Sequence, residues 1–295
     1  MNKRCVHFFG DGLWAYKSLE QLLINPNYKI AAVILRHKPD LEIKKICDEQ
    51  NIRIINPIDI NTLDFQTIPN AEMGISVSYD QIFKADTIGK YRYGIINLHA
   101  SSLPNYKGRN VLNWALINGE DKIHITIHWV DKGVDTGPII HQHEIKILED
   151  ETYEELLDKC YEASPIALSE ALRKLEKGNP STIIQEHILK LPILCTRRIE
   201  GDEIINWEWS SMRIHNFVRA LSIDSLYART YIDGEEIQIK RTEYLKFAPV
   251  YIDICGSVLK KEKTSFIVKT GDSYIRILEW AAKNKISLGN RLQNN

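Results

Sequence analysis

The chain has 295 residues, of which 44% are hydrophobic and 26% charged, a composition that fits one large globular domain or two of ordinary size. The formal net charge of −1 excludes a strong overall attraction to nucleic acid or to an anionic membrane. The five cysteines are scattered without the paired spacing of a zinc site, so reduced thiols in a cytoplasmic protein without a bound metal are expected.

Short apolar segments alternate with helical patterns through the first half of the chain. The first segment, residues 6–9, is too short for a signal peptide or a membrane span, so no membrane partner is expected. The other predicted strands are residues 28–35, 52–55, 73–78, 94–98 and 123–130. The predicted helices are residues 13–23, 41–49, 110–119 and 151–177. Strands that alternate with helices predict an α/β fold with a mostly parallel sheet.

The pattern changes beyond residue 180. Residues 181–205 show no regular pattern and are interpreted as a connection, and residues 210–220 predict one helix. Short β-type segments follow, with the Asp-Gly and Gly-Asp turns that are typical of hairpins. We therefore predict two domains, residues 1–205 and residues 206–295. The second has 14 lysines and arginines against 10 acidic residues, whereas the first has 24 against 29.

Two segments carry residues suited to chemistry. Residues 94–108 read Gly-Ile-Ile-Asn-Leu-His-Ala-Ser-Ser-Leu-Pro-Asn-Tyr-Lys-Gly, and residues 130–139 read Val-Asp-Lys-Gly-Val-Asp-Thr-Gly-Pro-Ile. Because side chains two residues apart on a strand project to the same side, Asn97 and His99 are predicted to lie together. An amide, an imidazole and the carboxylate of Asp135 on loops at strand ends can form a proton-transfer site.

The pattern Asn-x-His-x-Ser-x-Leu-Pro-x-x-x-Gly followed by Asp-x-Gly-Pro-Ile resembles that of the folate-dependent formyltransferases. The resemblance implies a Rossmann-like formyltransferase domain, an OB-like β-barrel as C-terminal domain, and 10-formyltetrahydrofolate as co-substrate. It also implies catalytic roles. Asn97 would donate to the formyl oxygen, His99 would accept the proton of the attacking amine, and Asp135 would orient His99 and relay the proton.

The resemblance also places the folate in this chain by position. The residues that it assigns to the folate are Ser78, Tyr79, Ile82, Phe83, Val130, Asp131, Lys132, Gly133 and Val134. For Tyr79, Ile82 and Phe83 an alternative stays open, in which these side chains pack in the core.

For the acceptor, the sequence favours a small molecule. The tRNA formyltransferases have a long basic loop after the second strand, and here that region is only residues 36–40. Residues 108–114 and 204–207 resemble the sugar formyltransferases. We therefore predict formyl transfer to a nucleotide-linked amino-deoxysugar, specifically a dTDP-4-amino-4,6-dideoxyhexose for surface polysaccharide, with no nucleic-acid partner and with a homodimer left open. The predicted substrate-binding residues are Lys107, Arg109, Asn110 and Trp207.

Other interpretations stay open beside this one. The alternative enzyme is a methionyl-tRNA formyltransferase, and the alternative class is a folate- or nucleic-acid-binding module without catalysis. Gly10-x-Gly12 after the first strand invites a dehydrogenase interpretation, but the third glycine and the acidic residue of that motif are missing. Trp207 and Trp209 fit a hydrophobic core as well as a stacking site.

Overall fold

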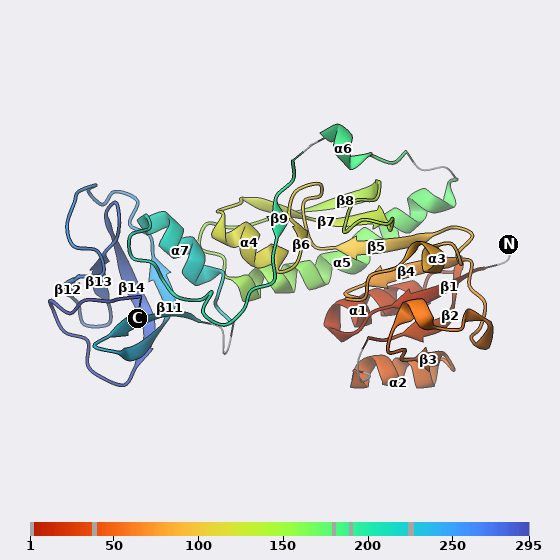
Figure 1. The fold of residues 1–295 in the computed structure, drawn as a ribbon, viewed down its shortest axis with the longest axis horizontal. Helices are drawn as coiled ribbons and strands as arrows, with labels where there is room; N and C mark the ends of the chain where they lie inside the picture. Colours follow the sequence, from red (N-terminus) through yellow and green to blue (C-terminus); the bar gives the residue numbers. More distant parts are fainter. Residues whose placement is uncertain (1–2, 37–39, 179–180, 189–190, 224–226, 295) are drawn as a thin grey trace. The chain divides into compact units, whose positions relative to one another are not determined.

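The computed structural model describes residues 3–36, 40–178, 181–188, 191–223 and 227–294 (Figure 1). The chain forms two compact units. Unit 1 comprises Met1–Gly108, Lys122–Ile145 and Asp158–Cys195, and unit 2 comprises Arg109–Asp121, Lys146–Leu157 and Thr196–Asn295. Among the described residues, no helix is long and apolar enough to cross a membrane. The predicted domain boundary after residue 205 stays a prediction.

The sheet of unit 1 has seven strands in the order β3-β2-β1-β4-β5-β7-β8. Strands β1 to β5 pair in parallel, and β7 pairs antiparallel with β5. The bounds are β1 (Arg4–Phe9), β2 (Tyr28–Ile34), β3 (Arg53–Ile55), β4 (Met73–Val77), β5 (Ile95–His99), β7 (Lys122–Trp129) and β8 (Ile139–Lys146). The prediction of a mixed α/β fold with a mostly parallel, Rossmann-like sheet is confirmed.

The central strands are buried because helices cover parallel sheets on both faces. Strand β4 is buried along its whole length. The helices of this part of the chain are α1 (Gly12–Leu23), α2 (Leu41–Glu49), α3 (Ala85–Ile88) and α5 (Tyr153–Glu176), with 3₁₀ turns at η1 (Ile60–Thr62) and η2 (Phe65–Thr67). The six strands predicted for this half all lie in the sheet, whereas its seventh strand, β8, was not predicted.

The predicted connection after α5 contains structure that the sequence pattern does not reveal. It includes α6 (Gln185–Ile188) and β9 (Leu194–Cys195), and β9 pairs in parallel with β6 (Lys107–Gly108). This two-stranded sheet brings the connection beside the loop that follows β5. The connection therefore supports the candidate site described below.

Unit 2 is built around a five-stranded antiparallel sheet in the order β10-β11-β14-β13-β12. Its elements are α4 (Val111–Ile117), α7 (Ser211–Arg219), β10 (Ala228–Ile232), β11 (Glu235–Glu243), β12 (Val258–Lys261), β13 (Phe266–Lys269) and β14 (Tyr274–Ala282). Near the C-terminus, an isolated β-bridge joins Gln293 to Tyr231 of the edge strand β10. A second bridge joins Arg291 to Ser257, the residue before the other edge strand, β12. A separate antiparallel β part is thus confirmed, while the closed OB-like barrel stays a prediction.

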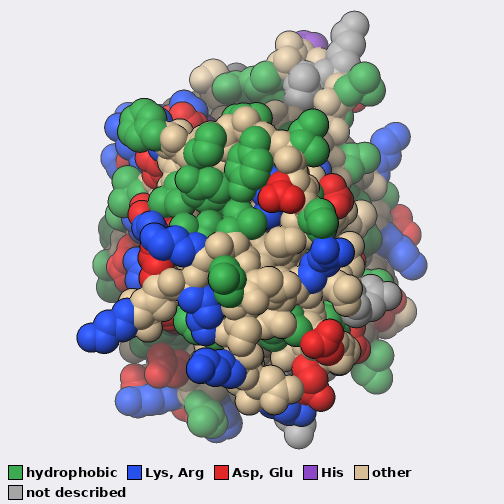
Figure 2. All heavy atoms as spheres, turned by 90° about the vertical axis from the view of Figure 1, so that its left-hand side faces the viewer, with side chains coloured by type: hydrophobic (Ala, Val, Ile, Leu, Met, Phe, Trp, Pro, Cys, Tyr) green, Lys and Arg blue, Asp and Glu red, His purple; other side chains and the backbone are tan. Residues whose placement is uncertain are grey.

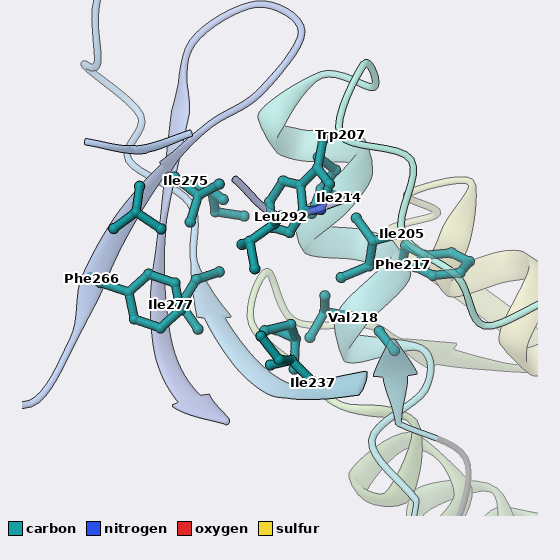
Figure 3. Close-up of a cluster of buried hydrophobic side chains, with 14 of the residues drawn as sticks. Ile205, Trp207, Ile214, Phe217, Val218, Ile237, Phe266, Ile275, Ile277 and Leu292 are labelled. Carbon is teal, nitrogen blue, oxygen red and sulfur yellow. The ribbon is translucent and has the colours of Figure 1, made fainter. Parts of the chain in front are cut away.

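The core of unit 2 lies between α7 and the sheet (Figure 3). Ile214 and Val218 of α7 are buried with Ile237 of β11 and Ile277 of β14. The helix begins after Ser210, whose hydroxyl accepts a hydrogen bond from the backbone N–H of Arg213, a common N-cap. An amphipathic helix on a twisted antiparallel sheet buries enough apolar surface to hold the unit together.

Candidate active site

Asn97 and His99 lie at the carboxyl end of β5, where polar side chains follow a buried apolar strand. Both are half-buried, and the intervening Leu98 is buried. In the register with β7, Asn97 lies opposite His128 and His99 lies opposite Thr126. The strand geometry thus aims the amide and the imidazole to one side of the sheet, as predicted.

Asp135 is brought to the same place by the loop between β7 and β8. Its carboxylate Oδ2 lies 3.6 Å from His99 Nε2 and accepts a hydrogen bond of 3.1 Å from the backbone N–H of Gly108. The backbone of Asp135 has φ 52°, in the left-handed region. Gln185 of α6 holds the loop, because its amide nitrogen donates to the carbonyl oxygens of Asp135 (2.9 Å) and Gly137 (2.7 Å). The structure therefore brings together the three predicted catalytic residues.

The hydrogen bonds of His99 define which ring nitrogen carries its proton. Nε2 lies 3.3 Å from the carbonyl oxygen of Tyr106, and a carbonyl can only accept. Neutral His99 therefore holds its proton on Nε2, facing Tyr106 and Asp135. Nδ1 is then the basic nitrogen, which suits it to accept a proton from a substrate.

His128 is a residue of this site that the sequence interpretation missed. Its ring is buried, and Nδ1 donates to the carbonyl oxygen of Trp129 (2.8 Å). Nε2 is then an acceptor and receives a hydrogen bond of 3.3 Å from Asn97 Nδ2, while it lies 3.7 Å from Asp135 Oδ1. His128 therefore fixes the amide of Asn97 with its nitrogen toward the ring. The sequence places His128 on a predicted strand just before the segment of residues 130–139, but its contact with Asn97 follows only from the register of β5 with β7.

Burial strongly affects the protonation of His128. The pKa of His128 is lowered from its ordinary value of 6.5 to about 4, mainly by desolvation, which Asp135 opposes and to which the nearby His99 adds. A neutral ring at this position is what the hydrogen bond from Asn97 requires.

We expect the stability of the protein to fall on acidification partly because of His128. Its folded pKa lies below its unfolded pKa, so the unfolded state binds the proton more readily and stability is lost as the pH falls from 6.5 toward about 4. The free energy of unfolding should fall by roughly 1–2 kcal/mol more between pH 7 and pH 5 in the wild type than in His128→Gln, which cannot titrate. Urea unfolding at several pH values measures this difference, and identical pH profiles would contradict the assignment.

The residues predicted to bind folate lie in two environments. The Tyr79 and Phe83 rings stack at 5.6 Å. Phe83 belongs to a buried core cluster with Phe9, and the partly buried Tyr79 and Val130 pack against that cluster. Phe83 is only 7% exposed, which favours the packing alternative for this residue. The hydroxyl of Tyr79 is buried and has no hydrogen-bond partner among the described residues, and burial raises the pKa of Tyr79.

The other predicted folate residues lie at the surface or shape loops. Ile82 and Val134 are 65% and 54% exposed, and Lys132 is also exposed. Ser78 has φ 55°, at the turn that follows β4. The carboxylate of Asp131 accepts hydrogen bonds from the backbone N–H of Gly133 and from the Thr136 hydroxyl, so it holds the loop that carries Asp135. The assignment of these residues to folate stays a prediction.

The predicted substrate-binding residues are not all at one surface. Lys107 is half-buried in β6 and Arg109 is exposed. Asn110 is the residue before α4, and its side-chain oxygen accepts a hydrogen bond from the backbone N–H of Arg198. Trp207 is 3% exposed in the core of unit 2, where its Nε1 donates to the Thr230 hydroxyl (2.9 Å). Its burial favours the core alternative over a stacking role.

Comparison with known proteins identifies the family. Residues 17–172 match the formyl transferase family, and residues 199–293 match the formyl transferase C-terminal domain. The chain belongs to the formyl transferase family. It is 31% identical to a methionyl-tRNA formyltransferase of Caldanaerobacter subterraneus subsp. tengcongensis over 97% of this chain and 94% of that protein. It is 30% identical to one of Acetivibrio thermocellus over 93% and 90% of the two chains.

Two solved structures share the fold. WlaRD, a sugar 3N-formyl transferase crystallised with dTDP and 5-N-formyl-THF, has a TM-score of 0.71 at 21% identity and covers 97% of this chain and 100% of its own. An N-formyltransferase from Helicobacter canadensis, in complex with folinic acid and dTDP-3-aminofucose, has a TM-score of 0.70 at 21% identity, over 94% and 99% of the two chains. The family and these folate complexes agree with the formyltetrahydrofolate co-substrate predicted from the sequence.

The predicted aminosugar acceptor is wrong. Relatives near 30% identity over most of the chain are methionyl-tRNA formyltransferases, whereas the sugar enzymes match at 21% and show the fold alone. The prediction relied on the resemblance of residues 108–114 and 204–207 to the sugar formyltransferases and on the short loop at residues 36–40, of which residues 37–39 lie outside the described residues. Surface loops change length readily between proteins with the same chemistry, so this loop was a weak discriminator. The surface-polysaccharide role and the exclusion of a nucleic-acid partner depended on the same argument, and the homodimer stays a prediction.

Proposed function

We propose that this formyltransferase moves the formyl group of 10-formyltetrahydrofolate to the amino group of methionyl-tRNA. The observation that carries the proposal is the similarity to methionyl-tRNA formyltransferases over both parts of the chain, at 31% identity. The Asn97, His99 and Asp135 arrangement supports it, because these groups suit attack by a primary amine on a formyl carbon. This chemistry is the same for any amine acceptor, so the relatives, and not the site, favour tRNA.

His99 acts as the general base in this proposal. The α-amino group of the methionyl ester must be neutral to attack, and it loses a proton as its nitrogen forms the bond to the formyl carbon. Nδ1 of His99 accepts that proton, and Asp135, 3.6 Å from Nε2, stabilises the imidazolium that results. The same proton then goes to the folate nitrogen as its bond to the formyl carbon breaks, which balances the transfer.

Asn97 stabilises the negative charge that develops on the formyl oxygen. An amide nitrogen has two hydrogens, and His128 accepts one of them at 3.3 Å. The second can be donated to the oxygen. A donor fixed in advance is effective because it needs no reorganisation during the reaction.

The Tyr79 region is the proposed folate site. A buried hydroxyl without a protein partner is costly unless a ligand satisfies it, and the Tyr79 hydroxyl is such a group. The exposed Ile82 and Val134 side chains offer apolar contact to a flat ring system. This assignment is supported by the unsatisfied hydroxyl more than by the packing of Phe83.

The C-terminal part of the chain, residues 206–295, is the proposed source of tRNA affinity. From residue 206 to the end of the chain there are 14 lysines and arginines against 10 acidic residues. Figure 2 shows lysine and arginine side chains beside a group of hydrophobic side chains on one face of the molecule. Cations that neutralise phosphates release counterions, so binding weakens as salt rises.

We expect kcat/KM for methionyl-tRNA to fall roughly ten- to a hundredfold between 50 and 200 mM salt, as about two to four phosphate contacts predict. The measurement is formylation of charged initiator tRNA with 10-formyltetrahydrofolate at several salt concentrations. The turnover rate at saturating tRNA is the control, because salt should change it far less. Formylation of charged tRNA at a rate that does not depend on salt would contradict the proposed electrostatic attraction of tRNA. A complete lack of formylation of charged tRNA would contradict the proposed function.

A further inference from the structure

Two histidines of β8 and a glutamate of α5 gather on unit 1. The Nε2 of His141 lies 2.7 Å from Glu170 Oε2, and the Nδ1 of His143 lies 3.3 Å from the same oxygen. One ligand atom from each of the three side chains lies within 4.8 Å of the others. We propose that His141, His143 and Glu170 form a binding site for a divalent transition-metal ion, with Zn²⁺ as the ion that fits best.

The local fold produces this convergence. His141 and His143 are two residues apart on β8, so their rings project to the same side of the strand. Glu170 lies in the C-terminal half of the long helix α5, in the part that belongs to unit 1. A side-chain nitrogen of Lys174, one turn further on, donates to the carbonyl oxygen of Ile140 (3.2 Å) and fixes the helix beside the strand.

The donor set matches the chemistry of zinc. Two imidazole nitrogens and one carboxylate oxygen form a common three-residue zinc site with a fourth position for water. Tetrahedral ligands at about 2.0–2.1 Å from the ion lie roughly 3.3 Å apart, so the present separations need only small changes in side-chain torsion. All three side chains are half-buried, which leaves access for the ion and a water ligand.

The charges around the cluster set the expected affinity. Both histidines lie within hydrogen-bonding distance of the same carboxylate oxygen of Glu170, so a metal ion bound by these nitrogens would replace the protons that they share with that oxygen. Arg173 lies 3.8 Å from the other oxygen of Glu170, and this cation together with Lys174 weakens the attraction for a metal ion. We therefore expect affinity below that of a closed structural zinc site.

The sequence interpretation expected no metal because the chain has neither the paired-cysteine nor the cysteine–histidine spacing of a metal site. A His-x-His pair whose third ligand is a glutamate on a later helix cannot be recognised from residue spacing in the sequence. The ion would join the edge strand β8 to α5, and β8 directly follows the loop that carries Asp135. The ion is expected to stabilise this edge of the sheet and to take no part in formyl transfer.

The test is a calorimetric titration of Zn²⁺ into the full chain after removal of metals with a chelator. We expect saturable binding of one equivalent with micromolar Kd, and a rise in the thermal unfolding midpoint that depends on Zn²⁺ concentration. His143→Gln and Glu170→Gln should each weaken binding roughly a hundredfold. Co²⁺ provides a second measurement, because a tetrahedral site gives it strong visible absorption.

The matched control is His187→Gln, which removes an exposed histidine of α6 and should leave Zn²⁺ binding unchanged. Circular dichroism of each variant without metal shows whether it folds, and His141→Gln replaces any variant that does not. Two results would overturn the proposal. One is a wild-type chain that shows no saturable binding at 100 μM Zn²⁺, and the other is equal binding by the wild type and the folded cluster variants.

Discussion

Replacement of His99 by alanine should lower kcat for formyl transfer roughly 10²–10⁴-fold while the protein stays folded. The imidazole is the proposed base for the attacking amine, and its Nε2 is held by the carbonyl oxygen of Tyr106 and by Asp135. Since His99 is half-buried at a strand end and is not part of a hydrophobic core, its removal should change the folded structure little. The measurement is steady-state formylation with 10-formyltetrahydrofolate and methionyl-tRNA.

Asp135→Asn separates the role of charge from that of shape. The asparagine can keep the hydrogen bond from the Gly108 backbone N–H but loses the negative charge beside His99. It should also lower kcat, and its loss should add little to that of His99→Ala in the double variant, because the two act as a unit. The control His187→Ala changes an exposed histidine and should keep full activity. A His99→Ala protein with more than a tenth of wild-type kcat would sink the general-base assignment.

Gly10→Ala should be among the most destabilising single substitutions in unit 1, with a loss of about 3 kcal/mol or more in the free energy of unfolding. A Cβ atom at this position would lie 1.8 Å from the carbonyl oxygen of Val77, a backbone atom of the adjacent strand that cannot rotate away. The backbone of Gly10 also has φ 144°, which side-chain-bearing residues rarely adopt. Both effects act at the turn between β1 and α1.

Gly12→Ala is a matched control two residues away. Its backbone has φ 73°, yet a Cβ atom would meet nothing within 4 Å, so only conformational strain of about 1–2 kcal/mol is expected. Urea unfolding of the two variants beside the wild type should give a clearly lower midpoint for Gly10→Ala. Equal midpoints would show that the close approach to Val77 is not a determinant of stability.

The sheet of unit 1 could be predicted because its strands are continuous apolar runs between helical patterns. Buried parallel strands such as β4 need apolar residues on both faces, and this need leaves a strong signal in the sequence. Strand β9 and its partner β6 have two residues each, too few for any periodicity. The two units also draw on separate stretches of chain, which local patterns do not reveal.

Some contacts of the candidate site could be predicted from the sequence and others could not. Asn97 and His99 could be placed together because strand geometry fixes residues two apart. Their contacts with His128 and Gln185 depend on strand register and on a loop from a distant part of the chain. Nothing within a short window specifies such pairs, so the sequence interpretation missed both residues.

The acceptor could not be derived from the site residues. Asn97, His99 and Asp135 act on an amine and a formyl carbon, and these groups are common to sugar and tRNA substrates. What distinguishes the acceptors lies in surfaces and loops, whose length and composition vary most between relatives. The overall similarity of the chain was therefore a better guide than one loop.

The most direct test of the account offers the wild-type protein charged methionyl initiator tRNA, the uncharged tRNA and a panel of dTDP-linked aminosugars in one reaction with 10-formyltetrahydrofolate. Mass spectrometry of each acceptor reports the transfer. We expect one added formyl group on the methionyl-tRNA alone, and its loss in the His99→Ala variant. A formyl group on an aminosugar with none on the methionyl-tRNA would contradict the proposed function.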